Sequence, residues 1–399
     1  MSVAVQRRGA CPSLPEPMET GDGLLARLAL AAPMTPHQLA GLARLACNLG
    51  NGLVEVTSRG KLQIRGLTPV SAPHLAGGLN ALGIAVRQGF PIEISALAGL
   101  DPTEAFDPRG LADEISDGAA ELMGRLAPKV SVVVDGGGAL HLSGLAADIA
   151  VRAGDSITLA RVPFARVAES EVAATVIALL ERLAARSNTT RMADLVKEQG
   201  IEALRASLGL ETFDSTIESS FPEPLGIHPL SDGKVALGIG FTFGQCDASA
   251  LEKLAQIAET FGVTHVEPTA GRALLLVGVA AESLEILRFE ASKLGFITDP
   301  ADPLRFVSAC PGAPSCGSGR METRVLAAEI AALANGRTVH VSGCAKGCAH
   351  PGPAAFTIVG LDEGAGIVVE GTPRDMPTRL VSIANLRTTL REMLEKIGA

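Results

Sequence analysis

The sequence contains no tryptophan or tyrosine, and aromatic residues make up only 3% of its 399 positions. Aromatic stacking therefore cannot be the main mode of ligand recognition. The formal net charge of −9 argues against nucleic acid as a partner, because binding to phosphates needs a basic surface. A large anionic ligand would instead have to be held by local clusters of arginine and lysine.

The chain also lacks an N-terminal apolar stretch of signal-peptide length, and no later run is long enough to cross a membrane. Its seven cysteines are an odd number, which does not suit a complete disulfide framework. We therefore expect a cytoplasmic protein with reduced thiols and no contact with a membrane. At this length the chain can form two or more domains, each with its own core.

Four of the cysteines form a tight pattern near the C-terminus, in turns rich in glycine and proline. Cys310 and Cys316 have five residues between them, and Cys344 and Cys348 have three. Four thiolates from two loops suit a [4Fe–4S] cluster, because each iron takes one sulfur ligand from the protein. A structural zinc site is the first alternative, although zinc pairs usually have two to four intervening residues. Unrelated structural cysteines are the second alternative.

An internal duplication indicates the fold. Residues 22–84 and 232–296 are alike, and the offset is a constant 212 residues from Val54 to Ile84. Each copy has the order strand, helix, strand, strand, helix, strand, which is the ferredoxin-like split βαβ pattern. A second unit, residues 91–160 and 303–360, follows each copy. The predicted fold class is α+β, with two pseudo-symmetric halves that each contain a ferredoxin-like unit followed by an α/β domain.

Residues 167–208 show apolar residues at helical spacing and are predicted to form connecting helices. The predicted domains follow the chain in order: a first ferredoxin-like half-domain at 1–90, a first α/β domain without a cluster at 91–165, a helical connector at 166–212, a second ferredoxin-like half-domain at 213–300, and a cluster-binding α/β domain with a C-terminal helix at 301–399.

The two halves differ where a ligand would bind. Arg59, Gln63 and Arg65 in the first copy correspond to Gly271, Leu275 and Val277 in the second. Strand alternation places the three polar residues, together with Lys61, on one face, and Arg27 is a plausible companion. A solvated strand face is one interpretation, but two arginines and a glutamine also suit carboxylates, so we favour an anion-binding surface.

The cluster cysteines occur only in the second half. Cys310 and Cys316 align near Leu97 and Thr103 of the first half, and Cys344 and Cys348 align near Gly137 and His141. A ligand between the halves would contact the redox centre on one side and the cationic surface on the other.

The duplication, the four-cysteine pattern and the segment TSRGKLQIRG resemble the siroheme nitrite and sulfite reductase superfamily. This resemblance implies that the α/β domain of each half is of the nitrite/sulfite-reductase type, and we call these two domains reductase-like. Within the superfamily, the segments RRGACPSLPEPMETGDGLLARL, SALAGLDPTE, APKVSVVVDGGG and SGCAKGCAHPGPA resemble the precorrin-3B synthase family over essentially the whole chain. The resemblance implies a monooxygenase of the aerobic cobalamin pathway, with precorrin-3A as substrate and dioxygen as oxidant. The implied reaction is hydroxylation of a meso carbon with lactone formation.

The resemblance also implies cofactors and site residues. The four cysteines would hold the cluster, a mononuclear non-haem iron would lie beside it, and NADH would be the ultimate electron source. No Gly-x-Gly-x-x-Gly motif follows a strand, so we expect a separate reductase to deliver the electrons. The residues carried over as ligands of the tetrapyrrole carboxylates are Arg27, Arg59, Gln63, Arg65 and Lys129.

Two other function classes remain open on the sequence. A siroheme-dependent nitrite or sulfite reductase would hold the macrocycle as a resident cofactor. The segment APKVSV keeps Lys129 but has Ser131 where the reductases have a second lysine, which weakens this alternative. A carrier of tetrapyrrole or iron–sulfur cluster without turnover is the third class.

Ligands for the mononuclear iron are not evident, and only His141 and His350 lie in the Gly-rich loops. Arg7 and Arg8 extend the basic surface or form an ordinary tail. The remaining cysteines, Cys11, Cys47 and Cys246, are expected to be structural, and Cys47 is expected in the core of its apolar helix.

Overall fold

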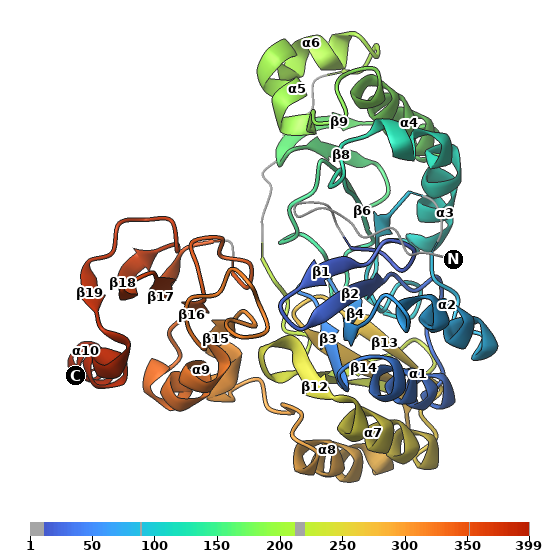
Figure 1. Ribbon diagram of the computed structural model, residues 1–399. Coiled ribbons are helices and arrows are strands. Elements are labelled where there is room, and N and C mark those ends of the chain that lie inside the picture. Colours follow the sequence, from blue (N-terminus) through green and yellow to red (C-terminus); the bar gives the residue numbers. More distant parts are fainter. Residues whose placement is uncertain (1–11, 88–89, 212–219, 351, 399) are drawn as a thin grey trace.

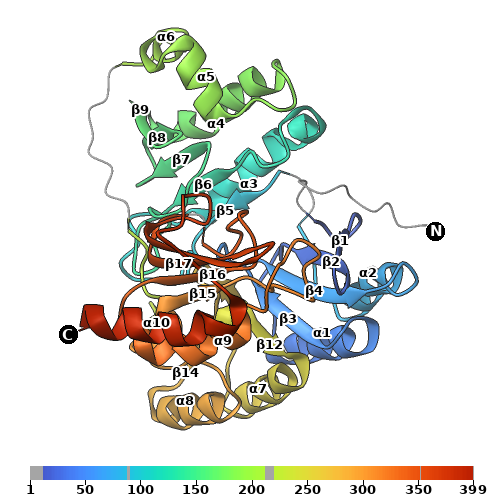
Figure 2. The ribbon, with the colours of Figure 1, turned by 60° about the vertical axis from the view of Figure 1, so that its left-hand side comes forward.

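The structure is a computed structural model that describes residues 12–87, 90–211, 220–350 and 352–398; Arg7, Arg8 and Cys11 lie outside these ranges. The described residues form four β-sheets (Figure 1). Two sheets belong to a ferredoxin-like domain, and each of the other two belongs to a reductase-like domain. Figure 1 shows the reductase-like domains as separate lobes beside the ferredoxin-like domain, and in the turned view of Figure 2 the lobe that contains α9 and α10 has come forward.

The ferredoxin-like domain contains both copies of the repeat, and both copies use antiparallel strands. The first copy comprises β1 (Met18–Thr20), β2 (Gly23–Leu28), α1 (Pro36–Leu49), β3 (Leu53–Val56), β4 (Leu62–Leu67) and α2 (Ala72–Ala81). The second comprises β10 (Gly226–Pro229), β11 (Val235–Gly240), β12 (Gln245–Asp247), α7 (Ala248–Thr260), β13 (His265–Thr269), β14 (Ala273–Val279) and α8 (Leu284–Lys293). The predicted α+β class is confirmed.

The final strand predicted for each copy is reduced to one bridge. Leu30 pairs with Val86 in the first copy, and Gly240 pairs with Ile297 in the second. The remaining helices and strands of each copy form as the sequence predicts, and local sequence signals mark their ends. For example, α1 begins with a capping box in which the Thr35 side chain accepts a hydrogen bond from the Gln38 backbone, while the Gln38 side chain accepts from the Thr35 backbone.

The two copies share one hydrophobic core, so they form one domain rather than two independent units. Helix α1 packs against α7, and strand β12 of the second copy pairs with β3 of the first. The buried face of α1 includes Leu39, Leu42 and Ala46. Cys47 is exposed, so its predicted core position is wrong. It follows Ala46 directly, and one residue turns a helix by about 100°, which places Cys47 outside the apolar stripe.

The two reductase-like domains have the same topology: three parallel strands followed by two antiparallel ones. The first contains β5 (Ile92–Glu93), α3 (Arg109–Gly118), β6 (Val132–Asp135), β7 (Ile149–Arg152), β8 (Ser156–Leu159) and β9 (Val162–Arg166). The second contains β15 (Val307–Ala309), α9 (Arg324–Ile330), β16 (Val339–Ser342), β17 (Ala354–Leu361), β18 (Gly364–Gly371), β19 (Arg379–Val381) and α10 (Ile383–Gly398).

Three helices follow β9, in the segment predicted to be helical: α4 (Glu169–Ala184), α5 (Met192–Gln199) and α6 (Ile201–Ala206). Val176, Leu180 and Leu183 of α4 are buried in the same core as β6 and β7. Helix α4 is therefore a layer of the first reductase-like domain. None of the helices in the described part of the chain is both long and apolar enough to cross a membrane.

Candidate redox and anion-binding site

Strand register identifies equivalent residues in the two halves. Glu55 pairs with Gln63 across β3 and β4, and Glu267 pairs with Leu275 across β13 and β14, which matches the 212-residue offset. In the reductase-like domains, Ile92 pairs with Val132 and Val307 pairs with Val339.

The same register relates the cysteines to the first half. Because Val339 is equivalent to Val132, Cys344 is equivalent to Gly137 and Cys348 to His141, as predicted. Because Val307 is equivalent to Ile92, Cys310 is equivalent to Ser95 rather than to Leu97. The predicted alignment near Leu97 rested on the similarity of the segments ISALAG at 94–99 and VSACPG at 307–312, and the strand register differs from it by two residues.

The two cysteine loops follow neighbouring parallel strands. Cys310 comes directly after β15 and Cys344 shortly after β16, so both loops lie at the carboxyl edge of one sheet. The backbone N–H of Gly343 donates a hydrogen bond to the Cys310 sulfur at 3.2 Å. A Cβ atom at position 343 would lie 3.2 Å from the Cα atoms of both Gly312 and Gly319. Glycine thus allows the backbones of the two loops to approach closely.

The Cys348 thiol lies within electrostatic range of the other three cysteines of the pattern. Cys310 is 8% exposed, and Cys348 is more accessible. Partial burial raises the pKa of the Cys348 thiol, and the charges of Cys310, Cys344 and Cys316 raise it further. Among the described residues, no three His, Cys, Asp or Glu side chains are placed to hold one metal ion. A [4Fe–4S] cluster does not need that convergence, because each thiolate binds a different iron atom.

One side of the first ferredoxin-like sheet carries the polar side chains of Arg27, Glu55, Gln63 and Arg65. We call this set of four residues the polar face. Leu62 and Ile64 alternate with Gln63 and Arg65 and enter the core on the other side. Arg27 is the register partner of Gln63. With the Gln63 amide oriented to satisfy both neighbours, its oxygen accepts from Arg27 Nε at 3.0 Å and its nitrogen donates to Glu55 at 3.1 Å.

Arg65 is buried, with its side chain only 5% exposed, and has a full set of partners. Its guanidinium donates to both carboxylate oxygens of Asp22, at 2.7 and 2.9 Å, and lies 3.5 Å from Glu55. It also donates to the Ser315 carbonyl at 3.1 Å. Since Ser315 immediately precedes Cys316, Arg65 directly connects the polar face to a cysteine loop.

Arg59 and Lys129 lie apart from the polar face. Arg59 lies in the turn between β3 and β4, where its Nη2 donates to the Ala146 carbonyl of the first reductase-like domain at 2.5 Å. Lys129 is exposed just before β6. Their predicted role as tetrapyrrole ligands therefore stays a prediction.

Three further arginines join the ferredoxin-like domain to the cysteine domain, and sequence reasoning missed them. Arg324 at the start of α9 pairs with Glu55 at 2.7 Å, and Arg272 donates to the carbonyl of Ala349 in the second cysteine loop. Arg305 pairs with Glu223 at 2.6 Å. Burial lowers the pKa of Arg272, and the neighbouring Arg305 and Arg324 charges lower it further. The comparison of the two internal repeats covered matched strand positions only, whereas these three arginines lie outside the strands.

The equivalent face of the second ferredoxin-like sheet is closed by apolar packing. Leu275 and Val277, the counterparts of Gln63 and Arg65, form a buried cluster with Leu97 and Leu140. The latter two residues come from the loops of the first reductase-like domain that correspond to the cysteine loops. The fold therefore supports two versions of this junction, and only the cysteine-containing version is polar.

The histidines do not identify an iron site. His141 lies in the first reductase-like domain, where its Nδ1 is 2.9 Å from the Ser143 hydroxyl, whereas His350 lies in the second. His350 stacks edge-on against His340, with ring centroids 5.8 Å apart. His340 is fully buried, and neither of its ring nitrogens has a hydrogen-bond partner. Burial, His350 and Arg272 lower the pKa of His340 to about 4, so it is neutral at pH 7.

Comparison with known proteins defines the class of this fold. Residues 16–82 and 228–290 match the family model "Nitrite/Sulfite reductase ferredoxin-like half domain". The structure of Mycobacterium tuberculosis NirA protein superimposes with a TM-score of 0.74 at 19% identity, covering 93% of this chain and 80% of that one. The protein therefore has the nitrite/sulfite reductase fold.

Sequence similarity narrows the class. A precorrin-3B synthase from Sinorhizobium sp is 35% identical over 94% of this chain and 86% of its own length. A ferredoxin–nitrite reductase from Synechococcus elongatus is 27% identical over 84% of this chain and 76% of its own length. The chain belongs to the precorrin-3B synthase family, which is a family of enzymes.

Proposed function

We propose that the protein is an oxygen-dependent monooxygenase that converts precorrin-3A to precorrin-3B in cobalamin biosynthesis. One oxygen atom of O₂ enters the product as a meso-carbon hydroxyl, and an acetate side chain of the macrocycle closes to a lactone. The second oxygen atom leaves as water, which consumes two electrons and two protons. NADH supplies these electrons through a separate reductase.

The polar face beside the cysteine loops is the observation that carries this proposal. At the equivalent junction, between the second ferredoxin-like copy and the first reductase-like domain, the fold packs leucine and valine side chains instead. The junction with the cysteine domain carries Arg27, Gln63 and Arg65, and Arg65 donates to the Ser315 carbonyl of a cysteine loop. A cationic, hydrogen-bonding surface beside a redox centre suits a carboxylate-rich macrocycle.

Cys310, Cys316, Cys344 and Cys348 are the residues that would hold a [4Fe–4S] cluster, which supplies electron transfer. Cys310 already accepts a hydrogen bond from the Gly343 backbone, as cluster sulfur ligands commonly do. Arg27 and Gln63 would orient the substrate carboxylates. Arg65 is saturated by carboxylates, so we assign it the positioning of the cysteine loop rather than direct contact. A mononuclear non-haem iron remains part of the proposal, without assigned ligands.

Anaerobically purified protein tests the cofactor and the reaction together. We expect about four cluster irons per chain and a broad absorption shoulder, without the intense Soret and red bands of siroheme. Cys344→Ser is expected to remove the cluster absorption. Cys47→Ser is the matched control, since Cys47 is exposed on α1 away from the cysteine loops.

Incubation with precorrin-3A, reductant and ¹⁸O₂ should then add one labelled oxygen per product molecule. Siroheme bands together with nitrite or sulfite reduction would establish the reductase alternative instead. Binding of the tetrapyrrole without incorporation of label would identify a carrier.

A further inference from the structure

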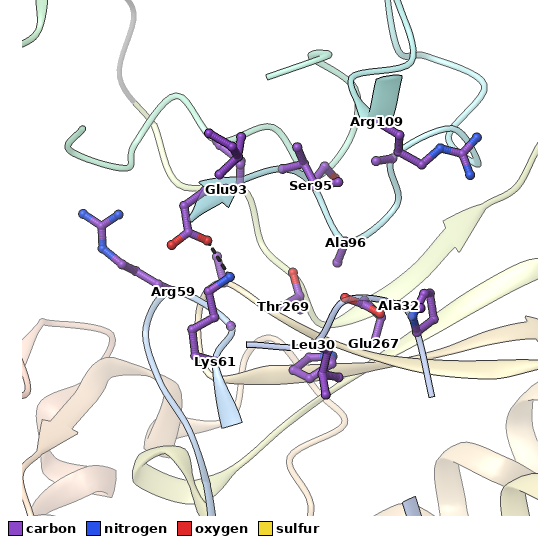
Figure 3. Close-up of a pocket in the computed structure, with 18 of the residues that line it drawn as sticks. Leu30, Ala32, Arg59, Lys61, Glu93, Ser95, Ala96, Arg109, Glu267 and Thr269 are labelled. Atoms are coloured by element: carbon purple, nitrogen blue, oxygen red, sulfur yellow. Dashed lines mark ion pairs between the residues drawn. The ribbon is translucent and has the colours of Figure 1, made fainter. Parts of the chain in front are cut away.

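A cavity of about 290 Å³ lies where both copies of the ferredoxin-like repeat meet the first reductase-like domain (Figure 3). Its lining includes Lys61 from the first copy, Glu267 from the second, and Glu93 from β5. None of the four clustered cysteines lines it. The volume is at the lower limit for organic ligand pockets, about 300–1,000 Å³, so only a small molecule or one side chain of a larger molecule fits.

The protein leaves one oxygen of Glu267 unsatisfied. Its Oε2 atom is buried and has no hydrogen-bond partner among the residues that the structure describes. Lys61 does not supply one, because it binds Glu93 at 2.8 Å, as the dashed line in Figure 3 shows. A buried carboxylate oxygen without a donor disfavours the charged form of the group, so Glu267 holds a proton more readily than an exposed glutamate does.

The repeat shows that this state of Glu267 is not a requirement of the fold. Its counterpart Glu55 occupies the same strand position and forms ion pairs with Arg65 and Arg324. In the second copy, Val277 stands at the position of Arg65. The apolar side chain cannot provide the charge that one of the two arginines provides to Glu55.

The second arginine contact of Glu55 is not reproduced either. Arg109 is the counterpart of Arg324, since each is the first residue of the helix between the first two strands of its domain. Arg109 binds Asp107 instead, through two nitrogens at 2.6 and 2.9 Å. Glu267 therefore lacks both of the contacts that hold Glu55 as a carboxylate.

The charges around Glu267 favour an anion in the cavity. Burial raises the pKa of Glu267 to about 7, although the charges of Lys61 and Arg87 oppose this rise. Glu93 balances the charge of Lys61. Once Glu267 is protonated, it no longer opposes the charge of Arg87, which also lines the cavity. His265 adds no charge to this wall at pH 7, because burial lowers its pKa from 6.5.

We propose that this cavity binds a short-chain carboxylate, with protonated Glu267 as the hydrogen-bond donor. The hydroxyl of the Glu267 carboxyl group donates to one oxygen of the ligand carboxylate. Hydrogen bonds to an ionised acceptor are roughly twice as strong as those between neutral groups, so the ligand charge strengthens this contact. The charge of Arg87 attracts the same anion across a partly enclosed wall.

The test is isothermal titration of the purified full-length chain with propionate, which stays ionised between pH 6.5 and pH 8. Only protonated Glu267 donates to it, so the affinity should fall about eightfold over this range, in which a group with a pKa of about 7 loses its proton. Propionamide has the same shape without the charge and should bind severalfold more weakly at pH 6.5. No saturable binding of propionate, or equal affinity at both pH values, would overturn the proposal.

Variants link the pH dependence to Glu267. Glu267→Gln keeps a donating N–H in place of the hydroxyl but does not titrate, so it should bind propionate equally well at pH 6.5 and pH 8. Glu267→Leu removes the donor and should weaken binding at pH 6.5 by about tenfold or more. The matched control is Glu259→Gln on the exposed surface of α7, which should keep the pH dependence of the wild type. If Glu267→Gln kept that dependence, the assignment to Glu267 would be wrong.

A free acid and a carboxylate side chain of the proposed macrocycle substrate offer the same chemistry to this cavity. Repeating the propionate titration with saturating precorrin-3A, in the absence of dioxygen, distinguishes the two sources. Loss of propionate binding would identify a macrocycle side chain as the occupant, and unchanged binding would identify a free acid. Because the readout is propionate binding and not turnover, failure of this proposal would leave the cluster and the monooxygenase reaction untouched.

Discussion

Replacement of Arg65 by methionine tests the connection between the polar face and the cysteine loop. The substitution keeps the aliphatic length but leaves Asp22 without its cation and Glu55 with Arg324 only. Loss of one partner from a buried ion pair typically costs about 3–5 kcal/mol. Because Glu55 retains Arg324 as a cation at 2.7 Å, we expect the free energy of unfolding to fall by about 3 kcal/mol, the lower end of this range.

The assay is thermal unfolding of the purified chain, followed by circular dichroism. A loss of about 3 kcal/mol corresponds to a fall in Tm of about 6–12 °C for a domain of this size. The control is Arg44→Met, which removes an arginine from the more exposed pair with Glu252 at 2.9 Å. Exposed pairs contribute about 0–1 kcal/mol, so this control should change Tm much less.

The pH dependence of the same variant provides a second check. Burial alone would raise the pKa of Asp22, but hydrogen bonding and the charge of Arg65 outweigh it and hold this pKa below 3.8. The stabilisation by the pair is therefore present at neutral pH and is lost as the pH falls below that value. The difference between Arg65→Met and wild type should shrink in strong acid. A loss of stability no larger than that of Arg44→Met at pH 7 would refute the reasoning.

Two further predictions concern the two reductase-like domains. Gly343→Ala places a Cβ 3.2 Å from Gly312 and Gly319, so iron content per chain should fall severalfold, whereas Gly352→Ala, whose Cβ has only ordinary contacts, should bind iron normally; equal iron contents would contradict the close loop approach. Burial, with Asp101 and Asp107, raises the pKa of Glu104 to about 7, so the folded state holds an extra proton and its stability decreases as pH rises from 4.5 to about 7. Glu104→Gln should therefore gain about 1–2 kcal/mol over wild type between pH 4.5 and pH 8, allowing for partial exposure, and parallel pH profiles of Tm would exclude this effect.

The sequence was sufficient to predict the architecture because the duplication provided an internal comparison. The constant offset located both split βαβ units, and strand alternation placed Gln63 and Arg65 on the face opposite Leu62 and Ile64. These are local properties, which a periodic pattern records directly.

Ion pairs between residues that lie far apart in the chain could not be predicted from the sequence. The ion pairs of Arg65 with Asp22 and Glu55 were not predicted, because no pattern in the chain indicates that pairing. The predicted role of Arg65 in ligand binding stays a prediction. The exposed position of Cys47 shows a related limit. An apolar helix sequence does not specify which neighbouring residue marks the edge of the buried stripe.

The contrast between Glu55 and Glu267 shows how duplication separates function from fold. Both occupy the same position of the same strand pair, so neither the backbone nor the register distinguishes them. The difference lies in their partners, since two arginines hold Glu55, whereas Glu267 Oε2 has no hydrogen-bond partner among the residues that the structure describes. One copy therefore uses its glutamate to fix the junction with the cysteine domain. In the other copy, Val277 stands at the position of Arg65, so the fold itself does not require an ion pair there.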